Sequence, residues 1–405
     1  MDYNFDDDRS YFDDNKAYVD RRNARIAAQR AKQRKKKLFA RRATIVGIMI
    51  LILGLLIFGI SQLFGLMCGG SQQDAKDNVA PTTETVSNEK DKQAKEALNF
   101  VAFDVKDDPE KQGYFSSQNG AVYIYDNAAY ELFSGTDSSA QDYADCISEF
   151  KKSVGDKITV YNMIAPKPIE FYVPKNKTQS TSQAENIKAI YSSYTEDVVP
   201  INCYNELANH KDEYIYFKTD HHWTGLGAYY AYKAFCEQTD QKVLDLSVCT
   251  ENTIDGYEGS LAYCDGSLYE NLDTVHYWTF PYNAYGMRTE STGDTPYETS
   301  IYYEGATAGT YTYGVFIWGD CALYVEHNDD LKNGKKIAIV KESYGNAMVP
   351  YFTANYEEVH VIDFRHFDGN LKSYCEENGI TEVLFVNNIL AANTPIQVDR
   401  IRELF

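Results

Sequence analysis

No two cysteines in this chain have the C-x-x-C spacing that is typical of zinc sites. The chain has eight cysteines, and seven of them follow Cys68 at scattered positions. Because seven is an odd number, they cannot all pair with one another. We therefore expect mostly buried free thiols with at most one disulfide, and neither a metal site nor a cofactor held by cysteine.

Positive charge is scarce beyond the first 42 residues. Residues 1–20 hold seven Asp and two basic residues, and residues 21–42 hold eleven Lys or Arg and no acid. The rest of the chain has 26 basic and 52 acidic residues, a net charge of −26, compared with −20 for the whole chain. So acidic a domain repels nucleic acid, which excludes nucleic acid as a partner and suits a solvated extracytoplasmic setting.

Residues 43–67 contain no charged side chain. A run of 25 residues is long enough to cross the hydrocarbon core of a lipid bilayer. A buried core helix and a cleaved signal peptide are the alternatives, but the length of the run and the basic segment before it favour a transmembrane helix. We expect a single-pass protein of the cell membrane, with its N-terminus in the cytoplasm and its C-terminal domain extracellular. The basic segment can also contact anionic lipid headgroups.

The segment after the span lacks apolar periodicity. Residues 68–97 are rich in Gly, Ser, Thr, Asn, Gln and charge, which predicts a flexible linker. The chain contains no internal repeat. We therefore divide it into a cytoplasmic acidic and then basic segment (1–42), the transmembrane helix (43–67), the linker (68–97) and one extracytoplasmic domain (98–405).

The last 75 residues alternate between strand and helix patterns. Their strands are mostly apolar, which is typical of strands buried on both faces. The alternation predicts an α/β fold with a parallel sheet covered by helices, in which active sites lie at the carboxyl ends of the strands. We expect strands at 335–340, 358–363 and 381–386, and helices at 346–355 and 370–378.

Patterns earlier in the domain are more varied. Residues 250–326 are rich in Tyr, Thr and Gly and predict antiparallel strands and loops. Whether they form a separate module or an insertion that lines the cleft stays open from the sequence. The other expected elements are strands at 157–165 and 213–219 and helices at 183–194 and 225–238.

The first group of chemically useful side chains follows residue 219. Asp220 and His222 are two residues apart, so in an extended segment they point the same way. The carboxylate can then accept a hydrogen bond from Nδ1 of the imidazole and leave Nε2 free as a base. His221 is expected to point to the other face, and Trp223 to wall the pocket or stack on a sugar. A metal site using both histidines and a purely structural turn are the alternatives.

The second group directly follows the strand expected at 335–340. Ser343 lies at the carboxyl edge of the sheet and at the start of a helix, where backbone N–H groups can hold a developing oxyanion. Gly345 allows close approach of the backbone. The sequence predicts Ser343 as a nucleophile, with Tyr344 and Asn346 as oxyanion or substrate contacts. A simple helix cap is the alternative for Ser343.

Arg365 ends the next strand on the same edge of the sheet. Its guanidinium could bind an acyl carbonyl or a sugar oxygen, and a salt bridge to Asp363 or Asp368 is the alternative. Asn387 and Asn388 end the last strand and are weaker candidates for polar contacts. A base with its orienting carboxylate, a hydroxyl and hydrogen-bond donors thus converge on one edge, which favours nucleophilic catalysis.

Four blocks of this sequence together resemble the DHHW family, bacterial cell-surface proteins related to the SGNH-like domains of alginate O-acetylation. They are TDHHW, ESYGNAMVPYF, VIDFRHF and EENGITEVLFV. The resemblance covers roughly residues 98–405. In the related proteins an Asp-x-His-Trp motif precedes the nucleophilic Ser, a circularly permuted SGNH order, and this implies Asp220, His222 and Ser343 as the catalytic residues. The family usually has Asp before that Ser, whereas this chain has Glu342.

The resemblance implies a three-layer α/β/α SGNH-like domain with a β-rich insertion. It also implies O-acetylation of a cell-surface polysaccharide through an acetyl-serine, beside a polytopic membrane acyltransferase that supplies the acetyl group. No cofactor and no metal is expected. Two other hypotheses remain open from the sequence: a carbohydrate esterase (deacetylase) with the same triad, and a non-catalytic glycan-binding or assembly subunit.

Overall fold

The computed structural model describes residues 97–405. The expected cytoplasmic segment, the transmembrane helix and all but the last residue of the expected linker lie outside these residues. Within the described part, no helix combines the length and the apolar character that a membrane span requires.

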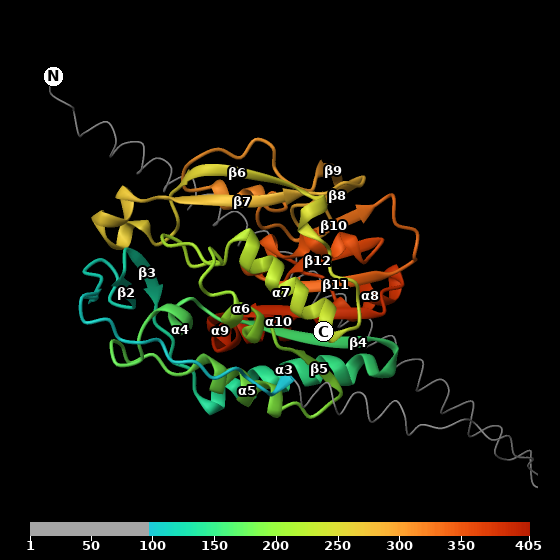
Figure 1. The fold of residues 1–405 in the computed structure, drawn as a ribbon. Helices are drawn as coiled ribbons and strands as arrows, with labels where there is room; N and C mark the ends of the chain where they lie inside the picture. Colours follow the sequence, from blue (N-terminus) through green and yellow to red (C-terminus); the bar gives the residue numbers. More distant parts are fainter. Residues whose placement is uncertain (1–96) are drawn as a thin grey trace, which may run out of the picture. The chain divides into compact units, whose positions relative to one another are not determined.

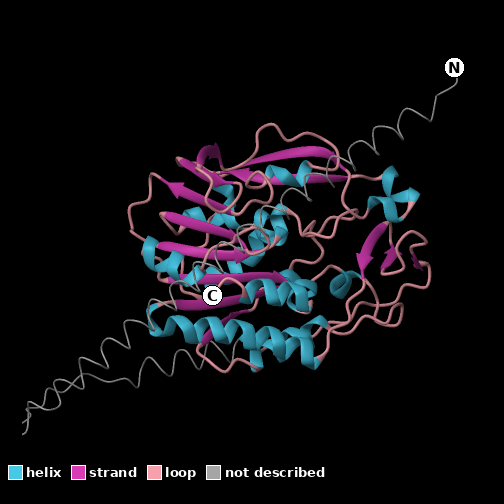
Figure 2. Cartoon of the chain, turned by 180° about the vertical axis from the view of Figure 1, so that it is seen from behind, coloured by secondary structure: helices cyan, strands magenta, loops and turns pink. Residues whose placement is uncertain are grey.

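An eight-stranded sheet runs through the described domain (Figures 1 and 2). Its strand order is β5-β4-β13-β11-β12-β10-β8-β9. The first five strands are parallel, and the last three are antiparallel to their neighbours. The parallel strands are β4 (Thr159–Ala165), β5 (Val198–Ile201), β11 (Lys336–Lys341), β12 (Glu358–Asp363) and β13 (Glu382–Asn388). The antiparallel strands are β8 (Ala284–Thr289), β9 (Tyr297–Ser300) and β10 (Leu323–Asn328).

Burial explains why the parallel strands could be predicted. In β11, β12 and β13, every residue after the first is buried. Strands covered on both faces are mostly apolar, and the sequence displays that pattern. The strands expected at 157–165, 335–340, 358–363 and 381–386 are confirmed to within two residues at either end.

Helices pack against the sheet in two groups. In the first, α3 contacts both α5 and α10, and in the second α6 contacts α7. The helices expected at 183–194, 225–238 and 370–378 are confirmed as α5, α7 and α8. The α-helices are α3 (Asp137–Val154), α4 (Ile169–Tyr172), α5 (Gln183–Ser192), α6 (Tyr204–Asn209), α7 (Gly225–Gln238), α8 (Leu371–Asn378), α9 (Ile389–Ala392) and α10 (Pro395–Arg402).

The two groups lie on opposite faces of the sheet. Tyr161 of β4 pairs with Leu384 of β13, so the next residue, Phe385, points to the other face. Phe385 packs on Phe150 of α3 and Tyr161 packs on Phe235 of α7, each with ring centroids 5.2 Å apart. The domain is therefore a mixed α/β fold with helical layers on both sides of the parallel strands.

Residues 250–326 are not a separate module. Their strands β8, β9 and β10 extend the large sheet beyond β12. The remaining two, β6 (Thr250–Tyr257) and β7 (Asp273–Thr279), form a two-stranded sheet that contacts α7. A third, three-stranded sheet joins β1 (Tyr114–Phe115), β2 (Val122–Tyr125) and β3 (Ala128–Glu131). The insertion thus continues the same sheet that carries the site.

The prediction of a strand at residues 213–219 is wrong. The only β-pairing of this segment is an isolated bridge between Tyr216 and Trp223, across a tight turn. Ile215, Tyr216 and Phe217 are all buried. Their apolar character therefore reflects packing around a turn and not one face of a sheet.

The segment at 346–355 is helical but does not form the expected α-helix. The chain forms two 3-10 helices, η6 (Ser343–Ala347) and η7 (Val349–Ala354). Pro350 lies in the first turn of η7, where its missing N–H leaves no hydrogen bond unmade. Ser343 is consequently the first residue of a short, tight helix two residues after β11 ends.

All seven cysteines of the described residues are unpaired, and six of them are buried. The expected free thiols are confirmed, and the single disulfide that the sequence allowed does not form among these residues.

Candidate active site

Ser343 and Asp220 each lie within hydrogen-bonding distance of His222, although Ser343 lies 121 positions after the histidine in the chain. Nε2 of His222 is 2.7 Å from Oγ of Ser343, and Nδ1 is 2.6 Å from Oδ1 of Asp220. Asp220 and His222 are buried, whereas Ser343 is partly exposed. The structure therefore brings together the three residues that the sequence singled out, in the order hydroxyl, imidazole, carboxylate.

The Asp220 carboxylate is held by backbone donors as well as by the imidazole. Oδ1 accepts from the backbone N–H of His222 at 2.9 Å, and Oδ2 accepts from the N–H of Ser260 at 2.8 Å. Burial on its own would raise the pKa of Asp220, but the imidazoles of His222 and His221 and these hydrogen bonds hold it well below its usual value. The carboxylate is therefore ionised at neutral pH and can stabilise an imidazolium.

Gly259 lets the insertion approach this carboxylate. A Cβ atom built on Gly259 would lie 2.3 Å from the carbonyl oxygen of Thr219 and 2.5 Å from Cβ of Asp220. No side chain fits at such distances. The contact between Ser260 and Asp220 thus depends on a glycine that no sequence motif marked.

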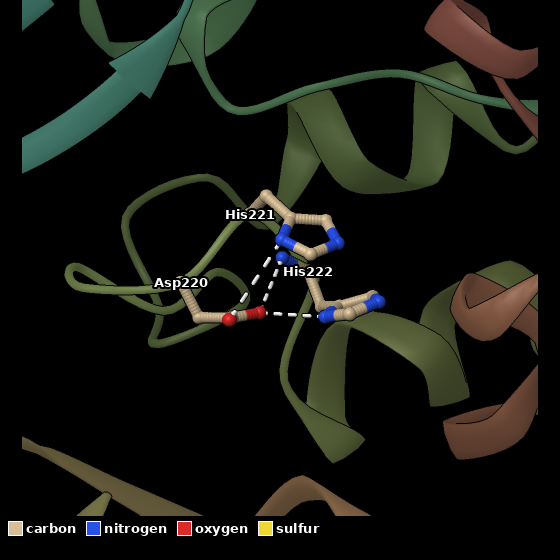
Figure 3. Close-up of side chains that lie close together, drawn as sticks. All are labelled: Asp220, His221 and His222. Atoms are coloured by element: carbon tan, nitrogen blue, oxygen red, sulfur yellow. Dashed lines mark hydrogen bonds and ion pairs between the residues drawn. The ribbon is translucent and has the colours of Figure 1, made fainter. Parts of the chain in front are cut away.

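His221 does not point away from its neighbour as the extended-strand argument required. Its ring centroid lies 3.8 Å from that of His222, and Figure 3 shows both imidazoles on the same side of Asp220. The reason is that the Asp220 carboxylate caps the His222 N–H and turns the chain. Asp220 and His222 do meet, but through this turn and not through strand periodicity. Nδ1 of His221 lies 2.6 Å from Oγ of Ser260, and burial and the charge of His222 lower the pKa of His221 well below its usual value.

Asp220, His221 and His222 could also be considered as metal ligands, because their ligand atoms lie within 4.8 Å of one another. Nδ1 of His222 is already bound to the carboxylate, and its Nε2 faces Ser343. A metal on these atoms would have to break the contact between base and hydroxyl. The donor set therefore fits proton transfer better than metal binding.

Tyr313, from the insertion, forms one wall of the site. Its ring stacks on His222 with centroids 4.1 Å apart and an interplanar angle of 11°, and its hydroxyl donates to the carbonyl of Ser343 at 3.1 Å. Tyr313 thus contacts both the His222 ring and the backbone of Ser343. Nothing in the local pattern distinguished it from the chain's other 33 tyrosines.

Trp223 and Tyr344 occupy positions different from those expected. Trp223 is fully buried and its Nε1 donates to the carbonyl of Tyr344 at 2.9 Å, so it cannot stack on a sugar. The hydroxyl of Tyr344, also buried, donates to the carbonyl of His221. Both side chains therefore connect the 220–223 segment to the 343–344 segment, and the Tyr344 hydroxyl is not free to hold an oxyanion.

Arg365 forms the salt bridge that was the alternative to substrate binding. It donates to Asp363 at 2.9 and 2.6 Å and lies 2.8 Å from Asp320. Asn346 donates to the same Asp320 at 2.9 Å, while its buried Oδ1 has no partner among the described residues. Asp320, which the sequence did not single out, thus pairs with both Arg365 and Asn346, the two residues expected to contact substrate.

The loop that carries Asp320 has a strained backbone, which hydrogen bonds from Arg288 hold in place. Ile317 and Trp318 have positive φ angles of 46° and 63°, which are unfavourable for bulky side chains. The buried Arg288 donates to the carbonyls of Ile317, Gly319 and Asp320 at 2.9–3.2 Å. These hydrogen bonds hold the loop in this conformation.

Glu342 accepts hydrogen bonds from the backbone on both sides of the site. Its Oε2 accepts from the Tyr344 N–H at 3.1 Å, and its Oε1 accepts from the Asn388 N–H at 2.9 Å. None of the hydrogen bonds among residues 97–405 uses the N–H of Ser343. That N–H is therefore the free backbone donor at the site. The Asn387 side chain accepts a hydrogen bond from the Tyr143 hydroxyl, and the Asn388 side chain caps α9. Both side chains are therefore used within the fold.

Comparison with known proteins agrees with this architecture. The family model described as DHHW protein matches residues 104–362. A DHHW family protein from Eubacterium siraeum is 32% identical, with a TM-score of 0.65 over 72% of this chain and 97% of that one. PatB1 from Bacillus cereus, solved with a sulfonyl adduct, is 20% identical, with a TM-score of 0.56 over 69% of this chain and 96% of that one. No curated protein matches. The family match, together with the 32% identical relative that is covered over 97% of its length, shows that this chain belongs to the DHHW family.

Proposed function

We propose that this protein is a membrane-anchored serine acyltransferase that O-acetylates a cell-surface polysaccharide through an acetyl-Ser343 intermediate. The observation that carries the proposal is the 2.7 Å contact between His222 and Ser343, with Asp220 on the far side of the imidazole. A serine alcohol is a weak nucleophile unless an adjacent base takes its proton. Here the base is in place and the hydroxyl is partly exposed.

In the first half-reaction, Oγ of Ser343 bonds to the carbonyl carbon of an acetyl donor while Nε2 of His222 takes the hydroxyl proton. Asp220 stabilises the imidazolium through Nδ1. The N–H of Ser343 is placed to donate to the oxyanion. The bond to the leaving group then breaks, and His222 returns the proton to that group. The product is an acetyl ester on Ser343.

In the second half-reaction, a sugar hydroxyl gives its proton to His222 and attacks the acetyl carbon. The bond to Oγ breaks, and Ser343 takes the proton back. Water in place of the sugar would release acetate, which is the esterase alternative. The partial exposure of Ser343 admits either acceptor, and the two reactions use the same triad.

Sulfonyl fluorides test the nucleophile directly, and PatB1 was solved with a sulfonyl adduct. Phenylmethylsulfonyl fluoride should label the full chain at Ser343 and abolish hydrolysis of a small acetyl ester. Ser343→Ala should lose both labelling and hydrolysis, whereas Ser291→Ala, at an exposed serine outside the site, should keep both. Labelling or hydrolysis that survives in Ser343→Ala would remove the chemistry from this triad.

Adding a glycan separates the two enzyme hypotheses. With an acetyl ester as donor, a transferase should place acetyl groups on the polysaccharide and release less acetate when the polysaccharide is present. Acetate release that does not respond to glycan would identify an esterase. If Ser343→Ala kept the protein's role in cells, neither enzyme would be right and a non-catalytic glycan-binding or assembly subunit would remain.

The membrane setting is part of the proposal. The uncharged residues 43–67 and the eleven basic residues before them support a span with the domain outside. A polytopic membrane acyltransferase would then supply the acetyl group from the other side of the bilayer. Protease added to intact cells should degrade the domain, and a domain protected until the cells are lysed would contradict this orientation.

A further inference from the structure

A cavity lies beside residues 211–218, the segment that leads into the catalytic pair. Its volume is about 420 Å³, within the range of small-molecule sites. Four segments line it: 126–130, around the β2–β3 turn; 168–172, which includes α4; 211–218; and Asn271. In Figure 1, β2, β3 and α4 lie together at one end of the domain. Neither Ser343 nor His222 lines the cavity.

Four tyrosines in the lining fall into two pairs. The hydroxyls of Tyr214 and Tyr216 donate to Asp273 and to the carbonyl of Pro166, at 2.5 and 2.6 Å, so these two residues have only ring surface to offer a ligand. The hydroxyls of Tyr130 and Tyr172 form no hydrogen bond with any residue in 97–405.

Tyr130 points most directly to a ligand. The residue is only 6% exposed, and its hydroxyl oxygen belongs to the part that remains accessible. Burial raises the pKa of Tyr130, which keeps the phenol protonated as a hydrogen-bond donor. No acceptor among residues 97–405 bonds to this hydroxyl, so it is available to a group in the cavity that the side chain lines.

Most charges around the cavity are already paired. Asp126 lies 2.6 Å from Lys111, and Lys211 lies 2.7 Å from Asp212. Lys218 is exposed and forms no ion pair within the described part of the chain. The free polar groups of the lining therefore include one ammonium and two phenols, which are hydrogen-bond donors, and the side-chain amides of Asn127 and Asn271, beside two apolar ring surfaces.

The cavity and the catalytic pair share one loop. Phe217 and Lys218 line the cavity, and the N–H of Phe217 donates to the carbonyl of His222 at 3.3 Å. Four residues separate Lys218 from His222, a span of at most about 14 Å even in extended chain. A polymer held in the cavity by one unit could thus present a unit a few positions along to Ser343.

We propose that this cavity is a carbohydrate-binding subsite that holds one sugar unit of the acceptor polysaccharide while another reaches Ser343. Ring surfaces cover the C–H face of a sugar, and the phenols and the ammonium donate to its oxygens. A purely apolar ligand would leave the Tyr130 and Tyr172 hydroxyls unpaired. The role as acceptor subsite rests on the proposed function, whereas sugar binding does not.

Binding of soluble oligosaccharides to the full chain in nanodiscs tests the subsite. The probes are hexamers of β-1,4-linked glucose, N-acetylglucosamine and galacturonic acid, followed by titration calorimetry. At least one hexamer should bind, and Tyr130→Phe and Lys218→Ala should each weaken that binding by about tenfold, the loss of one hydrogen bond. Lys188→Ala, an exposed lysine of α5 outside the cavity, should bind as the wild type does.

Two controls keep the result clear. Tyr130→Phe removes an unpaired hydroxyl and keeps the ring, so its Tm should not fall, and a purely structural role would leave binding unchanged. Sulfonyl labelling of Ser343 in the wild type reports on the catalytic proposal alone. Labelling without binding of any hexamer, or binding that Tyr130→Phe and Lys218→Ala do not weaken, overturns the subsite. Weakened binding without labelling overturns the acyltransferase and leaves a glycan-binding site.

Discussion

His221 and His222 are neighbours in the chain but have different hydrogen-bond partners. His222 lies between Asp220 and Ser343, whereas His221 meets the Ser260 hydroxyl. Besides His222 and Asp220, the charged groups near His221 include Lys167, whose ammonium donates to the His221 carbonyl at 3.2 Å. Burial, and then the charge of His222, lower the pKa of His221 well below 6.5. His221 therefore stays neutral in the folded protein under conditions where the unfolded chain takes up a proton.

This difference predicts a pH dependence of stability. Below about pH 6.5 the unfolded state binds one proton more at His221, so the free energy of unfolding should fall as the pH falls. The loss should approach about 1.4 kcal/mol per pH unit relative to His221→Gln, which cannot titrate. Denaturant unfolding at several pH values between 7.5 and 5 measures it. Parallel pH profiles for the wild type and His221→Gln would contradict the lowered pKa.

At the scale of elements, the segment after β6 packs against the 219–222 turn through Gly259. Gly259→Ala would place a Cβ against the backbone of Thr219, so the two segments must move apart and Ser260 must leave Asp220. We expect a loss of about 1–3 kcal/mol in unfolding free energy and a large loss of ester hydrolysis. Gly266→Ala, in the same region but with no atom within 4 Å of the new Cβ, is the matched control. Equal effects of the two changes would show that the close approach is not needed.

The elements that the sequence predicts well are those whose burial is uniform. The parallel strands are covered on both faces, so their apolar runs identify them without any tertiary information. Residues 213–219 show the limit, because three consecutive apolar residues packed around a turn look like a strand in sequence. The 3-10 geometry of η6 and η7 could not be predicted from the sequence either, although Pro350 indicated an irregular helix there.

The site was predictable where one segment carries a motif and not where separate segments meet. Asp220, His222 and Ser343 could be named from a short motif and from a serine after a strand. Tyr313 and Asp320 could not, because they reach the site only when the insertion adds β10 to the edge of the parallel strands. Arg365 was found with Asp363 as a possible partner, but its second partner, Asp320, comes from the insertion and could not be predicted.

At the scale of the whole molecule, buried charges join the two halves of the large sheet. Lys341 of β11 is 1% exposed, and its ammonium lies 3.0 Å from Asp363 of β12 and 3.4 Å from Asp320, which precedes β10. Arg365 bridges the same two carboxylates. The parallel strands and the antiparallel insertion thus meet at a cluster of two cations and two anions beside Ser343.

Removing one member of this cluster should destabilise the entire domain. Asp363→Asn leaves Lys341 buried with its more distant partner alone, and breaking a buried pair in this way costs about 3–5 kcal/mol of unfolding free energy. Asp126→Asn breaks the pair between Asp126, which is 50% exposed, and Lys111, which is 43% exposed. This change should cost less than about 1 kcal/mol of unfolding free energy. Thermal and denaturant unfolding of both variants measures the difference. Because Asp363 also orients Arg365, the same variant should slow ester hydrolysis. Similar small losses in the two variants would mean that water already reaches the cluster and that packing alone joins the halves.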